Sequence, residues 1–293
     1  MNIGYIFAVT AALSFGMAPT ALTMLMQKGI PNASAPFYAA SFLCVCSLIV
    51  CLYKKHSLKL PKKTAALLIL VGMFGMGATT STLATSYVYI PAGTATVIHF
   101  LFPTIVTIAS IAIFKQRPSK FTLPAIICSI SGMLFISVIG SEASDGALPG
   151  YLWAITSAFT YSFYMIANER LGFKTLPTPV SLCYLSGSGA MLMLIRALIS
   201  NGEVIFPQAP AVWINAVVYC AFMGGGYLFL NLSISRVGAV SAAFATLLEP
   251  ITSVICSILI LGSPVTVYTI IGFALILTAV WLNSAHPPLS AEK

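Results

Sequence analysis

The sequence has very few charged residues, and acidic ones are the rarest. Only 6 of its 293 residues are Asp or Glu, and charged residues of both signs make up 7%. Soluble domains carry about 25% charged residues, so this composition excludes an ordinary soluble protein. Hydrophobic residues account for 59%, and the mean hydropathy is +0.99. We therefore expect most of the chain to lie in lipid.

The shortage of acidic side chains also argues against catalysis. Asp145 is the single aspartate, and it falls between apolar segments. A membrane-embedded enzyme needs a nucleophile with its base, paired carboxylates or a metal cluster. His99 and Glu249 have no further partners with ligand spacing, so we expect no metal, no cofactor and no enzymatic activity. A Walker A motif is also missing, which leaves gradients as the energy source for any transport.

Long polar segments are missing too. The longest connections, residues 54–63 and 200–210, are too short for a soluble domain with its own core. Ten apolar runs of about 20 residues, the length that crosses a bilayer core, occupy most of the chain: 3–27, 34–53, 64–87, 92–114, 119–139, 149–169, 178–199, 211–234, 238–261 and 265–284. Continuous runs indicate helices rather than barrel strands. We expect an all-α integral membrane protein with ten transmembrane helices.

The basic residues fall in alternate loops. Only Lys28 and Arg196 are expected on the outer side, together with Glu142, Asp145 and Glu203. The other 12 of the 14 basic residues share the opposite side: Lys54, Lys55, Lys59, Lys62, Lys63, Lys115, Arg117, Lys120, Arg170, Lys174, Arg236 and Lys293. Cytoplasmic loops are the Lys- and Arg-rich ones, so we expect a cell-membrane protein with cytoplasmic N- and C-termini. Topology explains the net charge of +8, and nucleic-acid binding is not expected.

Two segments repeat across the chain. Residues 4–12 align with residues 150–158, and Gly, Tyr, Ala, Thr and Ala recur at the same spacing. An offset of 147 places Ala92, Ala95, Pro103, Ser110 and Ile113 on Ala239, Ala242, Pro250, Ser257 and Ile260. This indicates two five-helix repeats, residues 1–140 and 147–285, and a tail, 286–293. Because five is odd, the second half enters the membrane from the opposite face, as in inverted-repeat transporters.

Two proline-containing elements mark the fourth and ninth apolar runs. Pro91-Ala92-Gly93 precedes a run with a central Pro103, and Leu248-Glu249-Pro250 lies in the matching run. With the ten runs in a five-plus-five duplication, the chain resembles the EamA family of the drug/metabolite transporter superfamily. The resemblance implies export or import of small metabolites, including amino acids, by alternating access around a central cavity. The family commonly has a Gly-Glu pair after these runs, but this chain has Lys115-Gln116 and Gly262-Ser263 there, which leaves no glutamate for a gating ion pair.

The prolines and a carboxylate lie deep within the apolar runs. Pro103 and Pro250 lack an amide proton, so the carbonyls of His99 and Thr246 lose their helical partners. Lipid offers no replacement, so both runs are expected to face protein or cavity water. Glu249 lies about eleven residues from either end of its run, where charge is costly. Two roles stay open: contact with substrate, proton or gate, or a neutral carboxyl that joins helices by hydrogen bonds.

His99 is the other ionisable side chain at depth. In a functional role it contacts the substrate or carries a proton during transport. In a structural role it is hydrogen-bonded to a neighbouring backbone carbonyl.

Hydroxyl and aromatic side chains complete the candidate site. Ser14 and Phe15 align with Thr160 and Tyr161, and Tyr164 follows on the same helical face. These rings either hold an aromatic or cationic substrate or fill space.

A glycine triplet and an asparagine stand out in the eighth run. Gly224-Gly225-Gly226 indicates close helix approach. Asn231, about two turns later, is expected to hydrogen-bond across helices, with substrate contact as the alternative.

The most economical interpretation is a gradient-driven transporter of small metabolites, such as amino acids or related amines, with a coupled proton or ion. The alternatives are a receptor or scaffold without transport and a multidrug or cation exporter. The sequence leaves substrate identity, direction, coupling ion and oligomeric state open.

Overall fold

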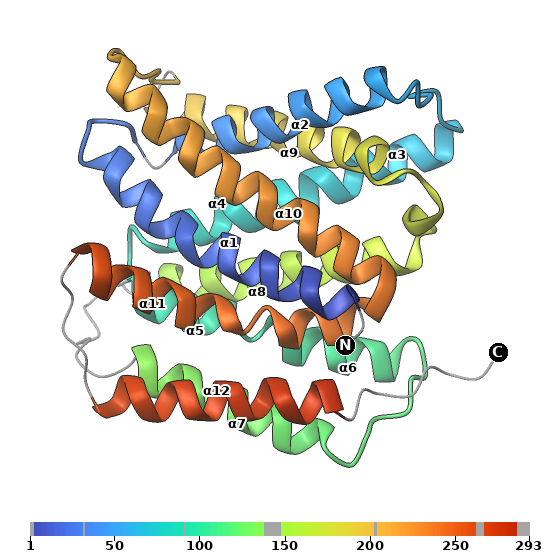
Figure 1. Cartoon of the computed structure of the whole chain (residues 1–293), viewed down its shortest axis with the longest axis vertical. Helices are drawn as coiled ribbons and strands as arrows, with labels where there is room; N and C mark the ends of the chain where they lie inside the picture. Colours follow the sequence, from blue (N-terminus) through green and yellow to red (C-terminus); the bar gives the residue numbers. More distant parts are fainter. Residues whose placement is uncertain are drawn as a thin grey trace.

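The computed structural model describes residues 3–31, 33–90, 92–137, 148–201, 204–261 and 267–285, and its elements in these ranges are helices (Figure 1). They are α1 (Ile3–Met26), α2 (Ala35–Tyr53), α3 (Lys62–Val71), the π-helical turn η1 (Gly72–Gly77), α4 (Ala78–Ser86), α5 (Ala92–His99), α6 (Phe102–Ala112), α7 (Thr122–Ser137), α8 (Leu148–Arg170), the 3₁₀ turn η2 (Phe173–Thr175), α9 (Thr178–Asn201), α10 (Pro210–Ala245), α11 (Leu248–Leu261) and α12 (Val267–Ala285). The expected all-α class is confirmed.

Five described stretches are long and apolar enough to cross a membrane: α1, α2, α3 to α4, α9 and α10. The other expected spans are less obvious for physical reasons. The helix α8 is long enough, but it carries many hydroxyl side chains, among them the buried Ser157, Tyr161 and Tyr164. The short helices α6 and α11 are parts of spans that break in the middle.

The two breaks fall at equivalent places of the two halves. A turn at Phe100 and Leu101 separates α5 from α6, and a turn at Thr246 and Leu247 separates α10 from α11. We expected Pro103 and Pro250 to free carbonyls inside continuous helices. Instead each proline lies in the first turn of a new helix, where its missing amide proton costs little.

The carbonyl of Thr246 accepts a hydrogen bond from the Glu249 amide at 2.9 Å, so the chain satisfies it locally. The same span has a second interruption at Gly238, whose φ of 80° lies in the left-handed region that glycine adopts readily.

The helices pack in a pattern that is preserved when the two halves are exchanged. The helix α1 of the first half packs on α10 and α11 of the second, and α8 of the second half packs on α4, η1, α5 and α6 of the first. The pairs α2 with α9 and α7 with α12 join equivalent helices, and they lie at opposite ends of the molecule in Figure 1. This arrangement supports a duplicated architecture around a centre formed by α1, α4, α8, α10 and the broken helices.

Glycines allow the central helices to approach closely, as expected for the triplet in α10. A Cβ built on Gly226 would lie 2.5 Å from the ring of Phe15, and one built on Gly225 would lie 3.7 Å from the Ser14 hydroxyl. Gly16 of α1 similarly allows the start of α11 to lie against α1. The central helices are therefore held at distances that larger side chains would prevent.

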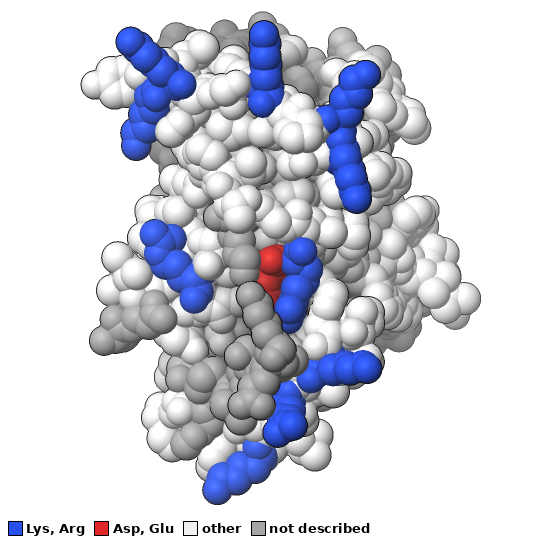
Figure 2. All heavy atoms as spheres, turned by 90° about the vertical axis from the view of Figure 1, so that its right-hand side faces the viewer, with Lys and Arg blue, Asp and Glu red and all other residues white. Residues whose placement is uncertain are grey.

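Basic side chains gather on one face of the molecule, the right-hand side of Figure 1, which Figure 2 shows face on. The beginning of α1 and the end of α12 lie on the same side (Figure 1). Arg170 and Arg236 cover the rings of Phe114 and Phe7 there, with guanidinium carbons 4.5 and 4.8 Å from the ring centroids. The distribution agrees with the expected basic side, while its assignment to the cytoplasm stays a prediction. Several sequence features lie outside the described residues: Pro91, Glu142, Asp145, Glu203, Gly262, Ser263 and the tail 286–293.

Candidate functional site

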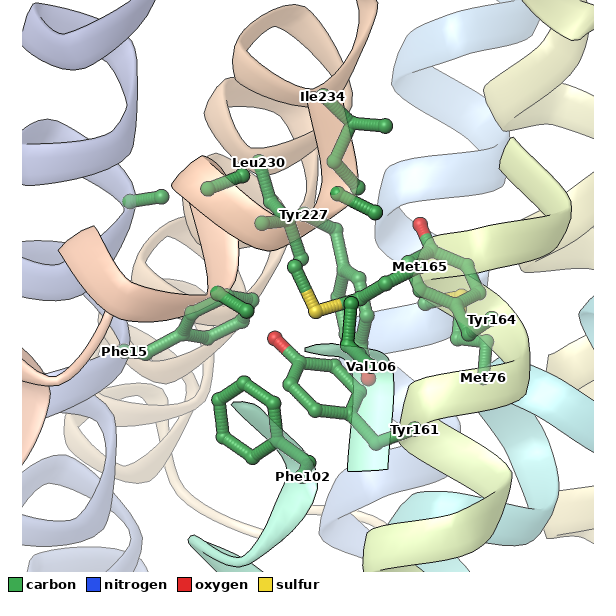
Figure 3. Close-up of a cluster of buried hydrophobic side chains, with 14 of the residues drawn as sticks. Phe15, Met76, Phe102, Val106, Tyr161, Tyr164, Met165, Tyr227, Leu230 and Ile234 are labelled. Atoms are coloured by element: carbon green, nitrogen blue, oxygen red, sulfur yellow. The ribbon is translucent and has the colours of Figure 1, made fainter. Parts of the chain in front are cut away.

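A row of aromatic side chains crosses the centre of the molecule (Figure 3). Phe15 of α1 meets Tyr227 of α10 edge to face with centroids 5.1 Å apart, and Tyr227 meets Tyr164 of α8 at 5.7 Å. Tyr164 lies parallel to Tyr161 at 6.2 Å, and Tyr161 meets Phe102 of α6 edge to face at 4.7 Å. Both halves of the chain therefore contribute rings to one continuous wall.

Polar groups connect this wall across helices. The Asn231 amide nitrogen donates to the Tyr164 hydroxyl at 2.6 Å and to the Tyr227 carbonyl at 2.8 Å. The Tyr227 hydroxyl and the Thr80 hydroxyl share a hydrogen bond of 3.4 Å. Asn231 therefore bonds across helices as expected, and it fixes the orientation of a ring in the row.

Glu249 lies in the first turn of α11, half-buried beside this wall. Its carboxyl is close enough to interact electrostatically with the hydroxyls of Tyr87, Tyr161 and Tyr227. The one ion pair between described residues joins Arg170 to Glu169, so no described cation neutralises Glu249. A negative charge at this place therefore needs a proton or a cationic ligand as its partner.

The position of Glu249 depends on α1. A Cβ built on Gly16 would lie 2.6 Å from the Glu249 carbonyl oxygen and 2.5 Å from the Thr252 Cβ atom. The absence of a side chain at Gly16 thus brings the first turn of α11 against α1 and its carboxylate toward the aromatic row.

His99 is buried at the end of α5, and its Nδ1 atom lies 2.9 Å from the Ser157 hydroxyl of α8. Ser157 donates its only proton to the Ala154 carbonyl at 2.6 Å, so Nδ1 must be the donor to Ser157. The rings of Phe102 and Tyr161 lie 5.5 and 5.3 Å from the imidazole. The partner is a hydroxyl rather than the backbone carbonyl of the structural alternative, and the geometry favours a structural link between α5 and α8.

Three other candidates form hydrogen bonds within the protein. Ser14 donates to the Thr10 carbonyl at 2.8 Å, and the Thr246 hydroxyl donates to the Ala243 carbonyl at 2.8 Å. Thr160 accepts from Thr79 at 2.9 Å and joins α8 to α4. The candidates that meet in the aromatic row are thus Phe15, Tyr161, Tyr164, Asn231 and His99, with Glu249 beside them.

Sequence reasoning missed several residues of this region. Tyr227 precedes Asn231 by one helical turn, a spacing that places both on one face and that offered a usable signal. Glu169 accepts a hydrogen bond from the Ala239 amide at 2.8 Å and so holds the chain just after the break at Gly238. Nothing in the local sequence marks that contact, because it joins residues of two different spans.

Comparisons with known proteins agree with the arrangement of two halves. The model of a family described as "EamA-like transporter family" matches residues 2–138 and again residues 148–285. A solved structure described as "Crystal structure of protein" superposes with a TM-score of 0.83 at 16% identity, over 97% of this chain and 98% of that one. At that identity the likeness concerns the fold alone.

Three relatives are described as transporters. YicL of Salmonella typhimurium, an uncharacterized inner membrane transporter, is 29% identical over 200 residues, and the match spans 66% of this chain but only 64% of that protein. An uncharacterized transporter of Archaeoglobus fulgidus is 26% identical over 92% of this chain and 94% of its own length. A probable terminal-alkyne amino-acid exporter of Streptantibioticus cattleyicolor is 24% identical over 76% of this chain and 67% of its own length.

Proposed function

Because the chain belongs to the EamA-like transporter family, whose members are not enzymes, we propose that it is a secondary transporter of small amine-containing metabolites, such as amino acids. In this proposal the multi-pass protein crosses the cell membrane ten times in two inverted five-helix repeats, with both termini in the cytoplasm. The basic face that also holds the ends of α1 and α12 supports this orientation.

The observation that carries the proposal is the Glu249 carboxyl, which forms no ion pair with any described residue and lies beside a row of aromatic rings. A carboxylate attracts an ammonium group, and the faces of aromatic rings add a further attraction for cations. The charge is worth more here than in water because the surroundings screen it poorly. A proton on Glu249 competes with the ammonium group, so one residue can exchange a coupled ion for substrate.

The paired breaks support alternating access. Each half contains one span that stops and restarts near mid-depth, and backbone breaks at such a depth need an interior rather than lipid around them. In transporters with inverted repeats, substrate sites lie beside such discontinuous helices. The two segments after the breaks, α6 and α11, are the elements that move in this proposal.

A second candidate is a cation exporter, and the absence of a described cation beside Glu249 favours it. An amino acid carries a carboxylate that also needs a partner, whereas a simple amine or a quaternary amine needs only Glu249 and the rings. The amino-acid exporter among the relatives favours the first candidate.

Uptake into proteoliposomes separates these functions. The matched probes are L-phenylalanine, phenethylamine and tetraethylammonium, each measured with and without a pH gradient. We expect phenethylamine to be bound, and Glu249→Gln to weaken its binding about tenfold, or about 1.4 kcal/mol. Glu249→Asp, which keeps the charge, is the matched control and should retain most of the binding.

The outcomes are distinct. Transport of L-phenylalanine identifies the amino-acid transporter, and transport of tetraethylammonium identifies the cation exporter. Near wild-type affinity, rate and pH response in Glu249→Gln would remove this residue from the site. Binding without flux of any probe would point instead to a receptor.

A further inference from the structure

A small polar pocket opens between α8, α9 and α10, away from Glu249. Its lining includes Asn168 of α8, Ser181 of α9, and Asn231 and Ser235 of α10. These residues lie toward the basic face, near the end of α8 and the beginning of α9. Asn231, which lines this pocket, donates a hydrogen bond to Tyr164 of the aromatic row.

A second pocket, which is lined in part by Tyr227 of the row, differs in character. It is lined mainly by apolar side chains, including Met76, Met193 and Met223, with Thr80 and Tyr227 as its polar members. The apolar pocket is lined by helices of both halves, namely α2, η1, α4, α9 and α10, whereas the polar pocket is lined by the second half alone.

Three side chains of the polar pocket already donate hydrogen bonds to the protein. The Asn168 amide nitrogen donates to the Tyr164 carbonyl at 2.8 Å, and the Asn231 amide nitrogen donates to the Tyr164 hydroxyl and the Tyr227 carbonyl. Backbone carbonyls can only accept, so these contacts fix which side-chain atom is nitrogen. Ser235 donates to the Leu232 carbonyl at 3.0 Å.

Three acceptor oxygens of the pocket receive no hydrogen bond from the described residues. Among the described residues no group donates to the amide oxygens of Asn168 and Asn231. Ser181 is only 5% exposed, and its hydroxyl oxygen has no hydrogen-bond partner in the described part of the chain. Buried polar atoms normally find partners, so an unpartnered one beside a pocket indicates a missing ligand or water.

We propose that this pocket is a second binding site, which takes the ammonium group of a small amine as it passes between the basic face and the aromatic row. An ammonium group has three N–H donors, which match the three acceptor oxygens that the pocket leaves open, those of Asn168, Ser181 and Asn231. No carboxylate lines the pocket, so binding is weak and suits a transit site. The proposal rests on the proposed function for its direction, because the same ammonium group would next meet Glu249.

The test uses ethylammonium as the probe. Ser181→Cys introduces a thiol into the pocket, and its alkylation by N-ethylmaleimide is timed in the purified full chain, with the background of the seven native cysteines measured in the parent and subtracted. Ethylammonium at about twice its Kd should slow alkylation roughly threefold, since the free fraction of a site is 1/(1 + [L]/Kd). Tetramethylammonium, a cation without N–H donors, and acetate at equal ionic strength should have little effect.

Two further variants keep the result interpretable. Ser235→Cys tests the opposite wall and replaces Ser181→Cys if that variant does not fold. Ser186→Cys, on α9 but buried and bonded to the Leu182 carbonyl, is the control and should show no protection. No protection by ethylammonium, or equal slowing by all three salts, overturns the proposal.

The measurement is then repeated with Glu249→Gln. Protection that persists shows that the pocket binds the amine independently of the central carboxylate. Protection that disappears assigns the effect to Glu249 and overturns the second site while leaving the proposed function intact. Protection without any flux in proteoliposomes leaves the second site standing and removes the transporter function.

Discussion

Gly16 helps to position Glu249 although it has no side chain, because the first turn of α11 packs directly against it. A methyl group there would lie 2.5 Å from Thr252 and 2.6 Å from the Glu249 carbonyl, closer than atoms in real structures approach. We therefore expect Gly16→Ala to displace the first turn of α11 and to cost about 1–3 kcal/mol through overpacking. Transport should fall more than folded yield, as measured by proteoliposome uptake and thermal unfolding.

Gly225→Ala is the matched control, because its added methyl group meets only the Ser14 hydroxyl at 3.7 Å. If Gly16→Ala transported like the control, the contact between α1 and α11 would not position the carboxylate.

His99 leads to a different expectation, because its hydrogen bond indicates a structural role. Ser157→Ala removes the acceptor of the Nδ1 proton and leaves a buried donor unpaired, which costs about 1–3 kcal/mol. The melting temperature should fall, while the KM for a transported probe stays unchanged. A changed KM at an unchanged melting temperature would place His99 in the substrate path instead.

The candidate residues differ in how visible they were in the sequence. Glu249 was visible because a carboxylate in a long apolar run is unusual. Phe15 and Tyr161 were visible because the repeat aligns them, and Tyr164 because it lies on the same helical face as Tyr161. Thr80 could not be selected in this way, because its hydroxyl becomes part of the site only through its hydrogen bond with Tyr227 of α10. Its neighbours in the sequence are also threonine, serine and alanine.

At the scale of the helices, the breaks before Pro103 and Pro250 are the features to test. Each proline starts a helix, so replacement by alanine removes little from the helix itself but allows the preceding helix to continue through the break. We expect Pro103→Ala and Pro250→Ala to lower transport more than thermal stability. The two measurements are proteoliposome uptake and the melting temperature of the purified protein.

Pro210→Ala is the control for this pair, since Pro210 starts α10 at an exposed position without a break before it. Wild-type uptake in both central variants would show that the breaks persist without proline or play no part in transport.

The sequence located these breaks only approximately. A proline in an apolar run is compatible with a kink, a helix end or a helix start, and the local residues do not distinguish them. In the structure both prolines lie at helix starts, and the turns at Phe100 and Thr246 satisfy their backbone groups locally.

For the whole molecule, the unequal distribution of basic residues predicts which loops share a compartment. Gln27 follows α1 and Ser57 follows α2, and both are exposed. We expect thiols introduced by Gln27→Cys and Ser57→Cys to react with a membrane-impermeant reagent from opposite sides in intact cells and inverted vesicles. Reaction of both from the same side would contradict the proposed ten-helix topology.

The helical class and most helix limits followed from the sequence, because long apolar runs have few other structures available in lipid. The run at 149–169 became α8 and the run at 178–199 became α9 with small changes at the ends. The π-helical turn at Gly72–Gly77 was not visible in the sequence. It depends on packing: η1 lies against α9, and a side chain at Gly72 would meet the Leu185 carbonyl and Ser188.

The difference between the two pockets has a consequence for the energetics of a full cycle. A duplicated protein with identical linings would have inward-open and outward-open states of equal free energy, and each would hold substrate equally well. Here the apolar pocket is lined by both halves, whereas the polar pocket is lined by the second half alone and its Asn168 corresponds to Leu22 of α1 in the repeat, so the two open states differ in hydration. The empty protein should rest unevenly between them, and half-saturating concentrations should differ between the two sides of the membrane. The gradient alone still sets the final distribution of substrate.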